Sequence, residues 1–123
     1  MTHLKRDDDE HPVPDHLRGL LEQVAQAFSE GDFQLRDHSI GHVAPIAPAT
    51  AEAIKKNVLA YGDRLAPLNP ATWERSCYRW MDTHWQVLVD LTTAGEQVSD
   101  LTLHAILRDS GGLLLEVQSV HVP

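Results

Sequence analysis

Five polar residues in the C-terminal half of the chain have the chemistry of a ligand site. His104 and Glu116 are expected to face each other on neighbouring strands, where a carboxylate raises the pKa of an imidazole and can orient it as a general base. Arg75 and Asp90 have opposite charges and are expected to pair across strands or to anchor a charged ligand. Thr102 lies in the same expected row as Asp90. We take these five as candidate ligand-binding residues. The alternative is that His104 with Glu116, and Arg75 with Asp90, form ordinary side-chain pairs on the sheet surface and bind no ligand.

Two other groups of side chains resemble reactive or metal sites but lack the required geometry. Cys77 would complete a Cys–His–acid triad with His104 and Glu116, but it would lie two strands from His104, about 10 Å away. A nucleophile and its base must come within about 2.6–3.2 Å of each other. His38 and His42 are spaced like two zinc ligands, but zinc needs three or four protein ligands. We therefore expect no catalytic residue, no metal site and no cofactor.

The elements that position the candidate residues lie after residue 74, where the apolar pattern changes to alternation. Alternation is typical of strands with one buried face, and we expect strands over 75–80, 85–93, 99–108 and 113–122. Aligning the apolar faces sets the registers. The expected cross-strand pairs are Tyr78 with Val87, Trp80 with Trp85, Val89 with Leu103, Leu91 with Leu101, Ala105 with Leu115 and Leu107 with Leu113. The opposite, outer face then carries a central row of Cys77, Leu88, His104 and Glu116.

Two helices are expected before these strands. Apolar residues recur at helical spacing from Leu17 to Phe28, so the first helix should begin at Asp15 and stop at Gly31. The second should be capped by Thr50 and ended by Gly62. We predict one α+β domain over residues 15–123, with two helices packed on one face of a four-stranded antiparallel meander. Residues 1–14 are charged and proline-containing, and we expect a disordered acidic arm that buries no side chain.

Composition limits the partners. The chain has 123 residues and a formal net charge of −8, with 10 Lys and Arg against 18 Asp and Glu. This balance argues against a nucleic acid or an anionic membrane surface as partner. It permits a basic protein partner. One cysteine, no apolar run long enough to span a bilayer and no apolar signal-peptide core indicate a cytoplasmic protein.

The chain resembles a small bacterial family of uncharacterised domains. The resemblance rests on the pattern Tyr78-x-Trp80-Met81-Asp82-x-x-Trp85-x-Val87-Leu88-Val89-Asp90-Leu91 and on flanking segments over 60–68, 98–103 and 120–123. It covers roughly residues 50–123 and departs from the family at Gly95-Glu96-Gln97, where more acidic residues are expected. The resemblance implies no established activity.

Three functions remain open. The first is a non-catalytic protein that binds a protein partner through the outer sheet face, as small bacterial immunity proteins bind toxins. The second is a small enzyme or ligand carrier similar to the cone-shaped folds related to nuclear transport factor 2, with a pocket around His104 and Glu116. The third is a homodimer formed through the same face. The last two predict, respectively, a concave pocket enclosing His104 and a dimeric mass in solution.

Overall fold

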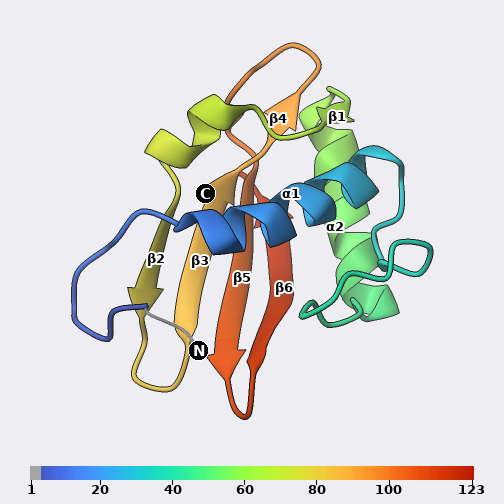
Figure 1. Cartoon of the computed structure of the whole chain (residues 1–123). Coiled ribbons are helices and arrows are strands. Elements are labelled where there is room, and N and C mark those ends of the chain that lie inside the picture. Colours follow the sequence, from blue (N-terminus) through green and yellow to red (C-terminus); the bar gives the residue numbers. More distant parts are fainter. Residues whose placement is uncertain (1–3) are drawn as a thin grey trace.

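The computed structural model describes residues 4–123, which form two α-helices, a short 3₁₀ helix and six strands (Figure 1). The helices are α1 (Asp15–Ser29), α2 (Pro48–Tyr61) and the 3₁₀ helix η1 (Pro70–Glu74). The strands are β1 (Leu65–Ala66), β2 (Cys77–Trp80), β3 (Trp85–Asp90), β4 (Thr92–Thr93), β5 (Thr102–Asp109) and β6 (Leu113–His121). Neighbouring strands pair antiparallel, so the predicted α+β class is confirmed.

The strands form two sheets rather than the single meander we expected. A four-stranded sheet has the order β2-β3-β5-β6, and β1 pairs with β4 in a separate two-stranded sheet. The expected strand over 85–93 is interrupted at Leu91, which is hydrogen-bonded through its backbone to Leu101 and Ser99. Beyond it, Thr92 and Thr93 turn to pair with the connector that follows α2. That proline-containing connector offered no alternating pattern, so its two-residue strand could not be predicted.

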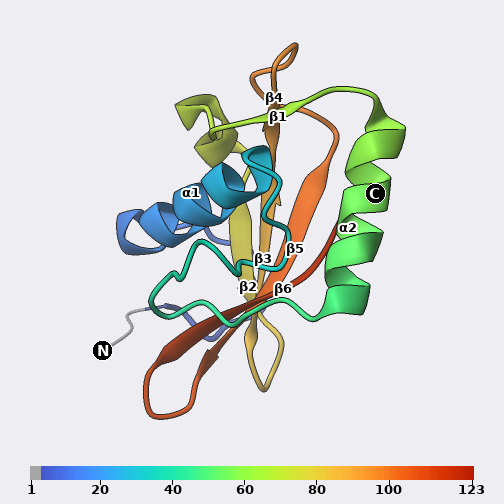
Figure 2. The same ribbon diagram turned by 90° about the vertical axis from the view of Figure 1, so that its right-hand side faces the viewer.

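The helices do not share one face of the sheet. Figures 1 and 2 show α1 crossing one face, whereas α2 lies alongside the edge strand β6. The prediction that both helices pack on one face is therefore wrong for α2. Asn57 on α2 donates a hydrogen bond to the carbonyl of Val120 at 2.9 Å, which satisfies an edge carbonyl of β6. The helix begins at Pro48, before the expected cap Thr50, because a residue without an N–H suits the first turn.

Two of the three strand pairings in the four-stranded sheet follow the apolar pattern, and the third, between β5 and β6, is shifted. The pairs of Trp80 with Trp85 and Val89 with Leu103 are confirmed. Leu107, however, pairs with Leu115 rather than Leu113. The hairpin loop is confined to residues 110–112, where two glycines take positive φ and let the strands pair right up to the turn. This shift of two residues keeps residues 113–117 on their predicted faces. Beyond Val117 the bulge between His104 and Ala105 changes the alternation, and Val120 is buried opposite Leu103.

The inner face of the sheet forms the core beneath α1. Most of its predicted members are almost fully buried, and six of them are at most 1% exposed: Trp85, Val87, Val89, Leu101, Leu103 and Leu107. Trp80 and Leu113 are only partly buried. The stripe of α1 that faces them includes Leu17, Leu21, Val24 and Phe28, each at most 2% exposed. Because alternate residues of a strand point to opposite faces, this packing also fixes which side chains stand on the outer face.

The segment before α1 is packed on the fold over its described residues. Leu4 is 8% exposed and Val13 is fully buried, so the prediction that residues 1–14 bury no side chain is wrong. His11 exchanges two backbone hydrogen bonds with Tyr78, which covers the free edge of β2. The Lys5 carbonyl accepts a hydrogen bond from Trp85 Nε1 at 2.9 Å. The first three residues of the expected arm lie outside the described part of the chain.

Candidate functional site

Three of the five predicted site residues come together on the outer face. Arg75, which follows η1, places its Nε 3.6 Å from Asp90 Oδ2. The hydroxyl of Thr102 donates to Asp90 Oδ1 at 2.8 Å. Side-chain exposure is 67% for Arg75 but 17% for Asp90, so the carboxylate is largely enclosed while the guanidinium reaches solvent. These residues line a cavity of about 390 Å³ together with Ser99, Asp100, Val122 and Pro123.

The other two predicted residues are separated. A β-bulge between His104 and Ala105 sets His104 opposite Ser119. Glu116 lies instead opposite Ile106, and its Oε2 is 3.4 Å from the Nε of Arg108. The predicted His104–Glu116 pair is therefore wrong, because both the short hairpin loop and the bulge displace β6. Neither residue lines the cavity beside Asp90.

His104 has a different partner, which the sequence did not reveal. Its ring stacks on that of His121, with the ring centroids 4.3 Å apart and the planes 12° apart. His104 Nε2 is buried and has no hydrogen-bond partner within residues 4–123. Burial, with His121 as a second cause, lowers the pKa of His104. An imidazole with a lowered pKa and no carboxylate beside it is poorly suited to act as a general base.

Cys77 lies on the same face and is not activated. The thiol is half-buried, and burial raises its pKa to about 12, with Glu10 and then Asp90 adding to the rise. The thiolate is the reactive form of cysteine. Cys77 is thus held as a neutral, unreactive thiol.

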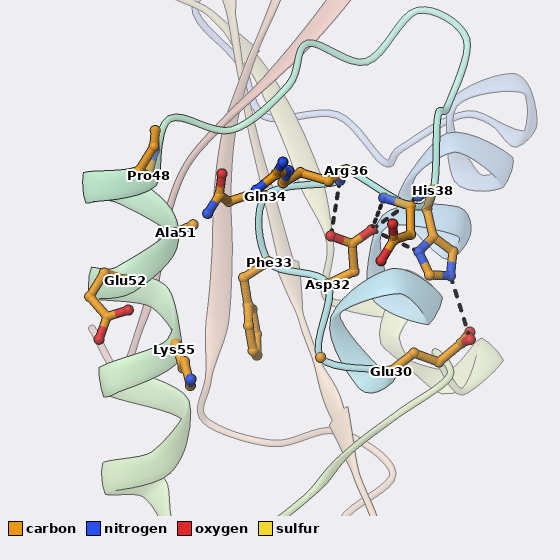
Figure 3. Close-up of a pocket in the computed structure, with 12 residues that line it drawn as sticks. Glu30, Asp32, Phe33, Gln34, Arg36, His38, Pro48, Ala51, Glu52 and Lys55 are labelled. Carbon is orange, nitrogen blue, oxygen red and sulfur yellow. Dashed lines mark hydrogen bonds and ion pairs between the residues drawn. The ribbon is translucent and has the colours of Figure 1, made fainter.

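A second cavity, which the sequence gave no reason to expect, lies between the loop over 30–38 and the first half of α2 (Figure 3). Its volume is about 640 Å³. Figure 3 shows Phe33 between the loop and Lys55 of α2, with Gln34 and Arg36 above it. The complete lining is Glu30, Gly31, Asp32, Phe33, Gln34, Arg36, Asp37, His38, Pro48, Ala51, Glu52 and Lys55.

Asp32 organises the loop beside this cavity. Its carboxylate accepts hydrogen bonds from the backbone amides of Arg36, Asp37 and His38 at 2.9, 2.9 and 3.0 Å. Its Oδ2 also lies 2.8 Å from His38 Nδ1. Burial alone would raise the pKa of Asp32, but the hydrogen bonds from His38 and the three amides outweigh it and lower the pKa to about 2.

His38 is held between two carboxylates. The hydrogen bond to Asp32 raises the pKa of His38, against a smaller opposing effect of burial, and Glu30 adds to the rise. Glu30 Oε1 lies 3.5 Å from His38 Nε2. His42 turns elsewhere and lies 3.1 Å from the carbonyl of Leu113. Within residues 4–123 no three His, Cys, Asp or Glu side chains are arranged to hold a metal ion.

The comparisons assign the chain to a family. The family described as a domain of unknown function (DUF7668) matches residues 25–123. The chain belongs to this family. The match begins earlier than the resemblance in the sequence suggested, so the family domain includes the loop over 30–38 and α2 as well as the four-stranded sheet. The segment before α1 and most of α1 lie outside the matched range.

No curated protein and no solved structure matches the chain significantly. The family description carries no activity, substrate or partner. None of the helices within residues 4–123 is long and apolar enough to cross a membrane.

Proposed function

We propose that this protein is a non-catalytic bacterial binding module that holds a basic protein partner against the outer face of its four-stranded sheet. The observation that carries the proposal is the uncovered centre of that face. Cys77, Leu88 and Ile106 stand there, each partly exposed, while α1 lies on the opposite face and α2 beside β6. Apolar side chains rimmed by polar ones are typical of protein interaction surfaces.

Charge supports a basic partner. The net charge of −8 creates a negative field that accelerates encounter with a positively charged protein. On the outer face, Asp90 and Glu116 already have arginine partners. The net charge of the whole molecule therefore contributes more to the rate of encounter than any single contact. Immunity proteins that neutralise toxins by binding are the nearest functional analogy, and a cytoplasmic location fits the single, unpaired cysteine.

The enzymatic alternative has less support. It required His104 and Glu116 to share a pocket, and the register separates them. The remaining candidates for a nucleophile or base on this face are Cys77, whose pKa is about 12, and His104, whose pKa is lowered. Asp90 is occupied by Arg75 and Thr102. The arrangement favours binding over chemistry.

An arginine placed in the centre of the face tests the proposal. Immobilised wild-type protein, Leu88→Arg and the control Leu59→Arg are exposed to a lysate; Leu59 is 71% exposed on α2 and away from the sheet. We expect a basic protein that the wild type and L59R retain and L88R loses. With the purified partner, association should slow markedly as NaCl is raised.

Three results would overturn the proposal. One is retention of the partner by L88R with its thermal unfolding unchanged. Another is an association rate independent of salt. The third is a dimeric mass in analytical ultracentrifugation that L88R converts to a monomer, because the face would then be a contact between copies of this chain.

A further inference from the structure

We infer that the cavity between the loop over 30–38 and α2 binds a free amino acid with an aromatic side chain. Its volume of about 640 Å³ lies within the range of small-molecule sites, roughly 300–1,000 Å³. This site is distinct from the outer face of the proposed function, because its lining comes from the loop that follows α1 and from α2. Three properties of the cavity point to this ligand: a fixed loop, equal numbers of positive and negative side chains left unpaired within the described residues, and an aromatic ring in its lining.

The loop is held in one conformation before any ligand arrives. Asp32 binds three successive backbone amides and His38, which closes residues 32–38 into a tight turn. Within that turn Leu35 has φ 57 and is 7% exposed. A branched, non-glycine side chain rarely adopts positive φ, and such strain persists where the surroundings impose it, often at ligand sites. The turn places Gln34 and Arg36 at the cavity wall (Figure 3).

Four charged side chains around the cavity are free to interact with a ligand. Asp32, Glu30 and His38 satisfy one another. Arg36, Asp37, Glu52 and Lys55 are exposed, and within residues 4–123 none of these four side chains has an ion-pair or hydrogen-bond partner.

The signs of these charges select the ligand. Two cations and two anions around one cavity match a zwitterion, whose carboxylate can meet Arg36 and Lys55 and whose ammonium group can meet Glu52 or Asp37. A phosphate dianion would lie among four carboxylates of the lining, and a simple amine would leave the two cations unpaired. The charge pattern therefore favours an amino acid over a nucleotide or an amine.

The apolar part of the cavity lining favours an aromatic side chain on the ligand. Phe33 is partly buried and its ring lies 5.3 Å from that of Phe28, at 35°, which fixes its position. Ala51 and Pro48 supply the apolar surface opposite. Aromatic rings prefer tilted or offset contacts with another ring, so a ligand ring can extend the Phe28–Phe33 pair.

The binding test is a titration of the ¹⁵N-labelled full-length protein with L-phenylalanine, followed by NMR. We expect saturable shifts of the amides of residues 31–38 and 49–55. N-acetyl-L-phenylalanine lacks the ammonium, phenethylamine lacks the carboxylate and glycine lacks the ring; each should bind at least tenfold more weakly. Equal affinity for any of the three, preferential binding of inorganic phosphate, or no saturation at millimolar L-phenylalanine would overturn the inference.

Matched variants locate the contacts. Arg36→Gln and Glu52→Gln should each weaken binding at least tenfold, because each removes one of the charges that meets the zwitterion. The control is Lys56→Gln, an exposed lysine on α2 that lies outside the cavity lining and should leave binding unchanged. Since all three positions are exposed, the fold should persist, as checked by circular dichroism. An unchanged affinity in both R36Q and E52Q would contradict the assignment.

Discussion

The imidazole rings of His104 and His121 stack at 4.3 Å, on neighbouring strands whose register is offset by a bulge. The bulge lets His104 pair with Ser119 while His121 pairs with Thr102, so the two rings lie diagonally across β5 and β6. Ser119 Oγ lies 3.0 Å from His121 Nδ1 and holds that ring. The stack occupies the place where the sequence predicted a histidine–carboxylate pair. Burial, with His121 as a second cause, lowers the pKa of His104, whereas the predicted carboxylate would have raised it.

This stack predicts a loss of stability in acid. Burial lowers the pKa of His104 below its ordinary value of 6.5, so near that pH the unfolded chain binds more protons than the folded one. Stability attributable to His104 is therefore present above pH 6.5 and falls as the pH drops below it. In His104→Phe, which keeps an aromatic ring but cannot titrate, the fall in free energy of unfolding between pH 7.5 and 5.5 should be smaller. Urea denaturation at both pH values measures it, and an equal fall in both proteins would contradict the prediction.

His38 predicts the opposite pH dependence. The hydrogen bond to Asp32 raises the pKa of His38 above its ordinary 6.5, so the stability it contributes is fully present below pH 6.5. That contribution is lost as the pH rises through the pKa of His38 in the folded protein. The difference in unfolding free energy between wild type and His38→Gln should therefore shrink from pH 5.5 to pH 8.5. A difference that stays constant across this range would show that the pair does not titrate as expected.

The Asp32 side chain should contribute more to stability than the neighbouring Asp37 side chain. Asp32→Ala removes three backbone hydrogen bonds as well as the contact with His38. Loss of a carboxylate that caps backbone amides typically costs about 0.5–2 kcal/mol, and we expect the upper part of this range. The control is Asp37→Ala, whose side chain has no partner within the described residues and which should change stability by less than about 0.5 kcal/mol. Equal effects in chemical denaturation would argue against the capping role.

The apolar pattern predicted the sheet well because it reports burial directly. Trp80 opposite Trp85 and Val89 opposite Leu103 follow from aligning inward-facing residues, and they needed no knowledge of loops. The pair of Leu107 with Leu115 could not be fixed in this way, since a shift of two residues leaves the faces unchanged. It was decided by two glycines in the hairpin loop, and a bulge then offsets the strands again beyond Ala105; neither leaves a periodic signal.

The relative placement of the five candidate residues was predicted in part for the same reason. Arg75, Asp90 and Thr102 lie on or beside strands whose register the core fixes, and they come together. Glu116 lies on the strand that shifted and was misplaced. The cavity beside Asp32 depends on an irregular loop, and a carboxylate that binds amides four to six residues ahead has no periodicity to detect.

The raised pKa of Cys77 predicts slow alkylation. A thiol whose pKa is about 12 carries very little thiolate at pH 8. We expect iodoacetamide to modify Cys77 at least tenfold more slowly in the folded protein than in urea-unfolded protein, measured by mass spectrometry over time. Glu10→Gln should accelerate the reaction less than unfolding does, because burial is the larger cause of the shift. Equal rates in the folded and unfolded protein would mean that the thiol is open to solvent.

The segment before α1 should be required for full stability, although it lies outside the family match. Val13 is fully buried, and its neighbour His11 closes the edge of β2 through two backbone hydrogen bonds with Tyr78. Val13→Ala removes buried methyl groups and leaves a cavity, which should cost about 1.5–3 kcal/mol. Val122→Ala is the matched control, because Val122 is 53% exposed and its truncation should cost less than about 0.5 kcal/mol. Thermal and urea denaturation of both variants compare the two costs. If V13A were as stable as V122A, the segment would contribute nothing to the core, and the contacts of His11 would reflect edge protection alone.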